Sequence, residues 1–356
     1  MRTTTAWQGT GNSTELKRAT IERRELRDDD LAVRVDYCGV CHSDLHALHG
    51  LVGKPAAGMV PGHEFTGTVT EVGSAVTDFA VGDKVAVGTI IDSCGECDMC
   101  RAGQENYCAV SRVLTYGGPD PRDETARDGN VTKGGYSREY IVRSTFAYPL
   151  PEGIDAAAAA PLMCAGITVW EPLRAAGVGP GSKVAVVGLG GVGHMGVKLA
   201  AALGADVTVL SRTADKADDA RALGASGLLL TNDDAQLAEA SGRFDVILDT
   251  VSAPHDLAPL LQLLALDGTL YVLGVPLPTE VPLMLLTMGR RKLSSSGTGG
   301  RRGTAEMLAF AGEHGIAADV EVLPSTRVND ALDRLERGDV RYRFVLDMAD
   351  LDAPAA

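Results

Sequence analysis

Short apolar runs separated by glycines dominate the first part of the chain. GHEFTGTVTEVGSAV (62–76) and GDKVAVGT (82–89) place Val, Phe and Thr between turn residues, which is typical of strands in an irregular β domain. The segment from Tyr116 to Tyr136 is polar and glycine-rich and predicts a surface loop. We therefore expect the N-terminal part to be mainly β structure.

From Lys183 the pattern changes to nearly continuous apolar runs, each followed by a helical or loop segment. These runs are KVAVV (183–187), DVTVLS (206–211), FDVILDTV (244–251) and TLYVLGV (269–275). The alternation predicts a parallel sheet covered on both faces. After Gly300, an amphipathic helix around Met307, a strand near Val320 and a final strand at Arg343–Leu346 are expected to complete the first domain.

Length and composition narrow the class of protein. With 356 residues the chain is long enough for two domains that each bury a core. The hydrophobic share of 45% and the charged share of 22% are those of an ordinary globular protein. The net charge of -14 repels phosphate backbones and anionic lipids, so we expect neither nucleic acid nor a membrane as a partner. Without a signal-like start or a membrane-length apolar run, we predict a cytoplasmic enzyme.

Four cysteines in the run CGECDMCRAGQENYC have the spacing of a structural zinc site, in which three sulfurs converge and the fourth closes a tetrahedral cage. They are Cys94, Cys97, Cys100 and Cys108. An iron–sulfur cluster is the alternative, but there the fourth cysteine comes three residues later, before a proline. Here seven residues intervene and Ala109 follows, which favours zinc. Unligated or disulfide-bonded cysteines are a further alternative, which this spacing in a non-secreted chain disfavours.

Cys41, His63, Glu64 and Cys164 suggest a second metal site, although they are far apart in sequence. Two thiolates and one imidazole with an open fourth position form one kind of catalytic zinc site. Taken singly, each residue is equally well explained by packing in a core. Only the combination with the other motifs favours a metal.

The run VVGLGGVGH has the form of a dinucleotide-binding fingerprint, because it follows a strand and opens a helix. Gly188 allows the tight turn, Gly190 lets the backbone approach a diphosphate, and Gly193 permits close packing of helix on strand. The helix N-terminus then holds the diphosphate. The intervening residues of this cofactor-binding turn are Leu189, Gly191 and Val192.

The end of the next strand is where the cofactor is selected. Sites for NAD carry Asp or Glu there to accept the ribose hydroxyls, whereas DVTVLSRTADK has Ser211, followed by Arg212 and Lys216. A small hydroxyl with two cations suits a 2′-phosphate, so NADP is the expected cofactor. A solvated basic corner that binds nothing is the alternative.

The chain resembles the zinc-containing medium-chain alcohol dehydrogenases, in particular the cinnamyl alcohol dehydrogenase-like branch. Besides the four-cysteine run, the matching segments are GVCHSDLH, PGHE, VTKGGYSREY, AAPLMCAGITVWEPL, VVGLGGVGH and RYRFVLDM. The resemblance implies an α/β protein with a GroES-like distorted β barrel as catalytic domain (1–165 and 298–356, with a structural zinc lobe at 94–108). It also implies a Rossmann domain with a doubly wound parallel sheet (166–297), an active site between the domains, and a homodimer.

The resemblance also assigns roles to residues. Cys41, His63 and Cys164 would be ligands of a catalytic zinc, and Glu64 would enter the coordination shell when water or substrate exchanges. Asp44 would orient His63, while Ser43 and His46 would relay a proton from the cofactor ribose to solvent. The remaining positions implied near NADP(H) are His42 at the pyrophosphate, Thr168, Thr250, Val275, Ser296 and Thr298.

The function implied is reversible hydride transfer between NADP(H) and a primary alcohol/aldehyde pair, with one catalytic and one structural zinc per chain. Ile90 or Ile91 stands where many relatives carry an aromatic residue, which favours broad-range aldehyde reduction over cinnamyl substrates. One alternative is a NAD-linked polyol or formaldehyde dehydrogenase of the same fold, which would show an acid in place of Ser211. Another is a zinc-stabilised relative without catalysis, which retention of Ser43 and all three ligands disfavours. Quinone reductase relatives lack both zincs.

Overall fold

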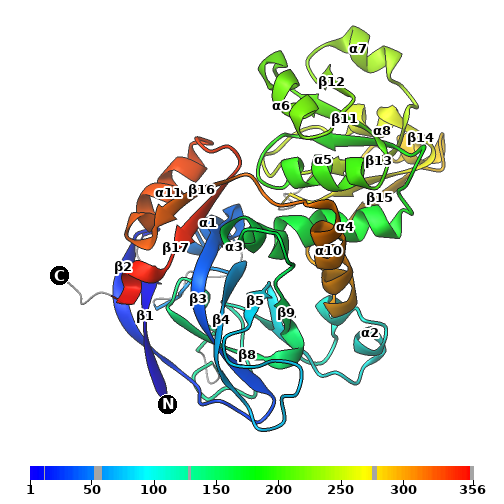
Figure 1. The fold of residues 1–356 in the computed structure, drawn as a ribbon. Helices are drawn as coiled ribbons and strands as arrows, with labels where there is room; N and C mark the ends of the chain where they lie inside the picture. The colour runs from blue at the N-terminus through cyan, green and yellow to red at the C-terminus, as the bar shows by residue number, and fades with distance from the viewer. Residues whose placement is uncertain (12, 52–57, 127–129, 275–278, 353–356) are drawn as a thin grey trace. The chain divides into compact units, whose positions relative to one another are not determined.

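The computed structural model divides the chain into two compact units. It describes residues 1–11, 13–51, 58–126, 130–274 and 279–352. Unit 1 comprises Met1–Cys164 and Gly300–Ala356, and unit 2 comprises Ala165–Gly299 (Figure 1). Both ends of the sequence therefore contribute to unit 1.

Unit 1 is built around a curved, mostly antiparallel sheet. In the described residues its strand order is β16-β17-β3-β4-β5-β9, with β8 also pairing with β3. The strands are β3 (Asp30–Val40), β4 (Phe65–Val72), β5 (Lys84–Val87), β8 (Glu139–Arg143), β9 (Ala147–Pro149), β16 (Val320–Pro324) and β17 (Arg343–Asp347). Because β17 pairs with β3, the C-terminal strand completes a sheet that the N-terminal segments began.

Smaller elements close unit 1 around its core. They are the hairpin β1 (Arg2–Gly9) and β2 (Leu16–Arg23), the pair β6 (Ile90–Asp92) and β7 (Val113–Leu114), and the helices α1 (His42–Leu48), α2 (Asp98–Arg101), α3 (Ala156–Ala159), α10 (Arg301–His314) and α11 (Val328–Glu336). The core combines Leu31, Val33 and Phe65 of the sheet with Leu332 of α11 and Phe344 of β17. The expected β domain, amphipathic helix and late strands are thus present. Among its described residues the segment predicted as a surface loop contains no strand, but Tyr136 at its end is buried.

Unit 2 contains a parallel sheet with the strand order β12-β11-β10-β13-β14-β15 in the described chain. The strands are β10 (Lys183–Val187), β11 (Asp206–Ser211), β12 (Gly227–Leu230), β13 (Phe244–Asp249), β14 (Leu264–Val272) and β15 (Lys292–Ser295). This is the doubly wound order, in which the strands follow one another outward in one direction from β10 to β12 and in the opposite direction from β13 to β15, so the strand order reverses between β10 and β13. Ligands of such sheets bind outside the carboxyl ends of the strands at that reversal.

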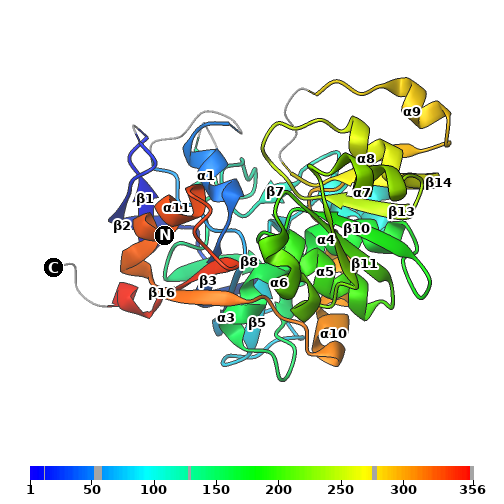
Figure 2. The same cartoon turned by 90° about the horizontal axis from the view of Figure 1, so that it is seen from above.

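Helices cover both faces of this sheet, as the continuous apolar runs predict. They are α4 (Ala165–Ala175), α5 (Gly193–Ala202), α6 (Ala217–Ala222), α7 (Asp234–Glu239), α8 (Ala258–Leu263) and α9 (Leu283–Thr287). Gly196 of α5 lies close to Val186 and Leu248. Leu261 of α8 packs in a cluster with Ile247, the neighbour of Leu248 along β13. Since successive strand residues face opposite sides, α5 and α8 lie on opposite faces (Figure 2).

No single helix in the described ranges is long and apolar enough to cross a membrane. Ala156–Met163 and Ala165–Ala175 reach that length only together and across a bend, and most of their residues are buried.

Candidate active site

Helix α1 begins at Cys41, and its first turn carries several of the predicted site residues. Cys41 is the N-cap residue, with extended backbone angles and a sulfur that accepts the Ser43 N–H at 3.5 Å. The Asp44 side chain reaches back to accept the Cys41 N–H at 3.0 Å. This reciprocal capping box fixes Cys41 at the end of β3.

Asp44 also fixes the orientation of His63. Its Oδ1 lies 3.1 Å from His63 Nδ1 and accepts the Gly62 N–H at 3.0 Å, while its Oδ2 accepts the Tyr136 hydroxyl at 3.2 Å. Asp44 is fully buried. The hydrogen bond at Nδ1 leaves His63 Nε2 available as a metal ligand, which is how outer carboxylates orient ligating histidines.

The three predicted catalytic-metal ligands converge in unit 1. His63 Nε2 lies 3.2 Å from Cys164 Sγ, the two sulfurs of Cys41 and Cys164 are 3.9 Å apart, and all three ligand atoms lie within 4.8 Å of one another. A hydrogen bond from Cys164 lowers the pKa of the Cys41 thiol well below its usual value, with help from the charges of Arg343 and His63. Burial opposes charge on His63, but the Asp44 carboxylate raises its pKa. Two soft sulfurs and one imidazole in a buried site form a donor set that fits zinc.

Glu64 lies next to this triad and is paired with an arginine from the other end of the chain. It hydrogen-bonds Arg343, the first residue of β17, and both side chains are buried. Burial raises the pKa of Glu64 to about 7 although Arg343 opposes the shift. Its second oxygen, Oε2, has no hydrogen-bond partner among the described residues. Gly39 has no Cβ here because one would lie 2.5 Å from Glu64 Oε1.

The other predicted residues of α1 lie on its more open side. Ser43 is exposed, and its Oγ lies 3.6 Å from Cys41 Sγ. His42 is exposed, and its ring centre is 6.2 Å from that of His46. Within the described chain, His46 Nδ1 is buried without a hydrogen-bond partner, and burial lowers the pKa of this imidazole. The structure thus brings Ser43 beside the triad and leaves His46 with a nitrogen available for a ligand.

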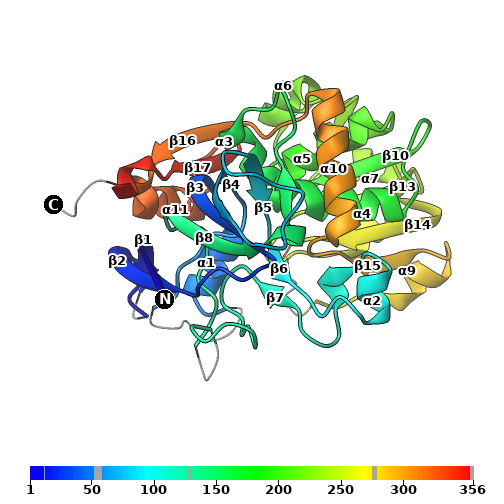
Figure 3. The same cartoon turned by 60° about the horizontal axis from the view of Figure 1, so that its bottom comes forward.

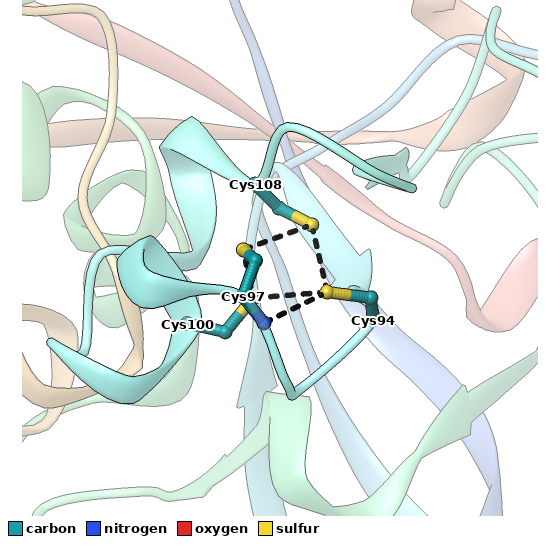
Figure 4. Close-up of side chains that lie close together, drawn as sticks. All are labelled: Cys94, Cys97, Cys100 and Cys108. Atoms are coloured by element: carbon teal, nitrogen blue, oxygen red, sulfur yellow. Dashed lines mark hydrogen bonds between the residues drawn. The ribbon is translucent and has the colours of Figure 1, made fainter.

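The four lobe cysteines form a second, separate cluster (Figure 4). Their sulfurs are 3.5 Å apart for Cys97–Cys100 and Cys94–Cys108, 3.8 Å for Cys94–Cys100 and 3.9 Å for Cys97–Cys108. Zinc–sulfur bonds of about 2.3 Å in a tetrahedron require sulfurs about 3.8 Å apart. All four are free of disulfides. Burial opposes charge on Cys108, but backbone N–H groups lower its pKa to about 6, which favours the thiolate that a metal needs.

In unit 2 the glycine run has the geometry of a phosphate-binding turn. Gly188 has φ of +84°, which only glycine adopts easily. A Cβ on Gly193 would lie 1.9 Å from the Gly188 carbonyl oxygen, whereas one on Gly190 would meet nothing within 4 Å. Helix α5 begins after Val192 without a side-chain cap. Its first N–H groups and the open space at Gly190 therefore fit a diphosphate, with Leu189 and Gly191 in the same turn.

The end of β11 carries the predicted 2′-phosphate residues. Ser211 is the last residue of the strand, and its Oγ accepts the Thr213 N–H at 3.3 Å. Arg212 is exposed and Lys216 is half-buried. Neither cation makes a hydrogen bond or an ion pair to any residue that the structure describes. No carboxylate takes the place of Ser211.

The remaining predicted cofactor residues come from different segments of unit 2. Thr168 of α4 donates to the Gly297 carbonyl at 3.4 Å, and Thr298 follows in the same segment. Ser296 Oγ is buried with no partner in the described chain. Thr250 donates to the carbonyl oxygen that ends β10 at 2.8 Å. The predicted residue Val275 lies outside the described residues.

Comparisons with known proteins find relatives over nearly the whole chain. Residues 27–152 match the alcohol dehydrogenase GroES-like domain, and residues 191–313 match the zinc-binding dehydrogenase domain. NADP-dependent alcohol dehydrogenase C 1 of Mycolicibacterium smegmatis is 47% identical over 353 residues, which is 99% of each chain.

The chain belongs to the zinc-containing medium-chain alcohol dehydrogenases. A probable formaldehyde dehydrogenase of Bacillus subtilis is 46% identical over 338 residues, covering 95% of both proteins. The solved structure of a cinnamyl alcohol dehydrogenase from Sorghum bicolor superposes with a TM-score of 0.93 at 42% identity, covering 99% of each chain. The family and the fold class predicted from the sequence are therefore confirmed.

Sequence reasoning missed two residues that complete this dehydrogenase site. Arg343 neutralises Glu64, and Tyr136 donates to the carboxylate that orients His63. Arg343 had a recognisable signal, since it begins a strand whose next three residues, Phe344 to Leu346, are apolar and buried. Ile90 and Ile91, expected to shape a substrate pocket, are both buried within the core of unit 1.

Proposed function

We propose that the protein is a zinc-dependent, NADP-linked oxidoreductase that interconverts aldehydes and primary alcohols, chiefly as a broad-range aldehyde reductase. The proposal rests on the convergence of Cys41, His63 and Cys164, whose two sulfurs and one nitrogen lie within 4.8 Å of one another. Three such ligands leave the fourth position of a tetrahedral zinc for water or substrate. When bound, zinc supplies a Lewis acid for the substrate oxygen and NADPH supplies the hydride.

The chain's own residues prepare this chemistry in three ways. Asp44 holds His63 in the tautomer that presents Nε2 to the metal. Arg343 balances the charge that two thiolates and Glu64 add to a buried site, which would otherwise be costly. Glu64 Oε2 has no hydrogen-bond partner among the described residues, and we propose that Glu64 replaces a departing ligand when water and substrate exchange.

The proton that reduction consumes is assigned to Ser43 and His46. Ser43 Oγ stands next to the metal ligand Cys41, and the orphaned Nδ1 of His46 is a buried polar atom that needs a partner. A ribose hydroxyl of the cofactor is the partner we propose. His42 is placed at the pyrophosphate on the same proposal.

Preference for NADP follows from the end of β11. Arg212 and Lys216 have no hydrogen-bond or ion-pair partner among the residues that the structure describes, and a 2′-phosphate would neutralise them. The hydroxyl of Ser211 leaves room that a carboxylate would fill and repel. The relative from Mycolicibacterium smegmatis carries NADP dependence in its name. Thr168, Ser296 and Thr298 complete the proposed cofactor contacts, and the orphaned Ser296 hydroxyl supports them.

We further propose a cytoplasmic homodimer. Six of the seven cysteines belong to the two ligand sets, which requires a reducing compartment.

Strand β15 is the last strand of its sheet, and the apolar side chains of Leu283, Met284 and Met288 beside it are 69%, 67% and 76% exposed. A second copy would cover them. Light scattering of Met284→Glu should then show monomer where the wild type shows dimer, and an unchanged mass would contradict this interface.

The test of the function is an initial-rate panel of aldehydes and alcohols with NADPH, NADH and their oxidised forms. We expect turnover of several unrelated aldehydes with NADPH and much weaker turnover with NADH. Efficient oxidation of one substrate with NAD would instead support the NAD-linked polyol or formaldehyde dehydrogenase. Cofactor binding without turnover of any substrate would support the non-catalytic relative.

A further inference from the structure

The loop between β13 and α8 lies directly against the glycine turn of unit 2. Thr250 Oγ1 donates to the Val187 carbonyl at 2.8 Å and lies 3.3 Å from the Gly188 carbonyl. A Cβ on Gly188 would lie 3.1 Å from Val251 Cγ2, and one on Gly193 would lie 3.2 Å from Thr250 Oγ1. The first residues of the loop therefore form one wall of the turn.

The same residues are closely packed on their other side. Gly274, which follows β14, would place a Cβ 2.2 Å from the Val251 carbonyl oxygen. The start of the loop therefore packs closely between the glycine turn on one side and Gly274 on the other. His255 stands at the other end of the loop.

The contact between His255 and Asp249 links the end of the loop to its start. His255 Nε2 lies 2.9 Å from Asp249 Oδ2, and its Nδ1 lies 2.9 Å from the Ala253 carbonyl oxygen. Asp249 is the last residue of β13 and is fully buried. Its other oxygen, Oδ1, accepts the Val251 N–H at 3.2 Å. One carboxylate thus holds the start of the loop directly and its end through His255.

The hydrogen bonds fix the number of protons that His255 and Asp249 carry together. The Ala253 carbonyl can only accept, so His255 Nδ1 carries a hydrogen. The Nε2–Oδ2 contact then contains one further proton, either as imidazolium with carboxylate or as imidazole with carboxylic acid. Both forms are neutral overall, which suits the fully buried Asp249, while the His255 side chain is 29% exposed. Burial raises the pKa of Asp249, although the charge of His255 opposes the shift.

We propose that His255 is a positioning residue for the cofactor, which acts through Asp249 to hold the 250–255 loop against the fingerprint turn. The inference rests on the proposed NADP(H) site. It concerns the reversal point between β10 and β13, where doubly wound sheets bind their ligands. His255 itself does not touch the reacting atoms in this proposal.

The test is an equilibrium fluorescence titration of zinc-loaded enzyme with NADPH. Replacing His255 by Ala leaves the buried Asp249 Oδ2 without this hydrogen bond and releases the end of the loop, so NADPH should bind roughly tenfold more weakly. His255→Gln keeps an N–H that can reach Asp249 and should recover part of the affinity. In steady-state rates, KM for NADPH should rise by a larger factor than kcat falls. Asp249→Asn carries the same test if His255→Ala does not fold.

His314 provides the matched control, because its Nδ1 makes the same 2.9 Å contact with a carbonyl, that of Phe310, within unit 1. His314→Ala should leave NADPH affinity unchanged. The double variant Asp249→Asn/His255→Ala should bind no more weakly than the worse single variant, since both remove one link. Wild-type affinity in His255→Ala, or additive losses in the double variant, would overturn the inference. Failure of the wild type to bind NADPH would instead overturn the proposed function, and this inference with it.

Discussion

Arg212 carries a charge that no described residue neutralises, and this makes it the sharpest probe of cofactor choice. Arg212→Ala should weaken NADPH binding by about 1.5 to 3 kcal/mol, tenfold or more, because a charged hydrogen bond to the 2′-phosphate is lost. Use of NADH should change little, since that cofactor has no phosphate there. The measurement is the ratio of kcat/KM for the two cofactors.

Arg221→Ala removes another exposed arginine of unit 2, one paired with Asp218, and should leave the ratio unaltered. Equal use of both cofactors by the wild type would contradict the argument.

His46 is the residue with which the proton path is tested. Its lowered pKa keeps the imidazole neutral, and thus able to accept a proton, below the usual pKa of histidine. His46→Ala should slow alcohol oxidation by a factor of about 10² to 10⁴. The loss should be greatest at low pH, where other bases are scarce. Because product release can hide this step, the assay is single-turnover hydride transfer across pH. His49→Ala removes an exposed histidine paired with Glu336 and is the control. If His46→Ala leaves the pH profile unchanged, His46 has no part in the proton path.

At this scale the sequence was informative where chemistry demands a residue type at a fixed spacing. The four lobe cysteines and the glycine turn are local patterns, and the structure places both in the expected geometry. The Glu64–Arg343 and His255–Asp249 pairs were not predicted. Glu64 and Arg343 are 279 residues apart, and only the pairing of β17 with β3 brings them together. His255 follows Asp249 closely, but nothing in the pattern shows that the loop folds back.

At the scale of elements, the lobe and helix α10 are joined through Glu105. This buried carboxylate accepts the Arg301 N–H at 2.8 Å, at the start of a helix whose N-cap, Gly300, offers no side chain. Arg302 of the same turn donates to the Ala102 carbonyl at the end of α2 at 2.6 Å. Figures 1 and 3 show α10 beginning beside α2. The lobe therefore caps the helix that follows the return of the chain to unit 1.

Loss of this cap should destabilise the protein. Glu105→Ala removes both the acceptor and the negative charge at a helix N-terminus, which should cost about 1 to 2 kcal/mol. Glu105→Gln retains an acceptor and should cost less. Urea unfolding is the measurement, with Glu96→Ala, an exposed residue of the same lobe, as the control. Equal midpoints for Glu105→Ala and Glu96→Ala would show that the cap contributes nothing.

For the whole molecule, the two ligand sets predict two zinc ions per chain. Cys97→Ser should lower the content toward one and reduce stability while leaving the catalytic triad intact. Cys38→Ala changes a buried cysteine outside both sets and should keep two. Metal analysis of purified protein gives the content directly. Iron in place of zinc at the lobe would contradict the structural assignment.

The fold as a whole was more predictable than the site. Apolar runs of strand length alternating with helical segments specify a parallel sheet. Strands β10, β11 and β13 begin with the predicted runs, and β14 overlaps the run predicted at 269–275 but begins earlier, whereas β12 and β15 were not predicted. The mixed sheet of unit 1 was expected only as irregular β structure. Its register depends on pairings between distant strands, such as β3 with β17, that no local periodicity encodes.

Catalysis at the zinc site is tested by aldehyde reduction with NADPH, measured as loss of nicotinamide absorbance, in zinc-loaded wild type and in Cys164→Ser. The wild type should turn over. Cys164→Ser should fold and bind NADPH with ordinary affinity, but it should turn over at least about a hundredfold more slowly, because one catalytic ligand is lost. Reduction by Cys164→Ser at the wild-type rate would contradict catalysis at the Cys41, His63 and Cys164 site.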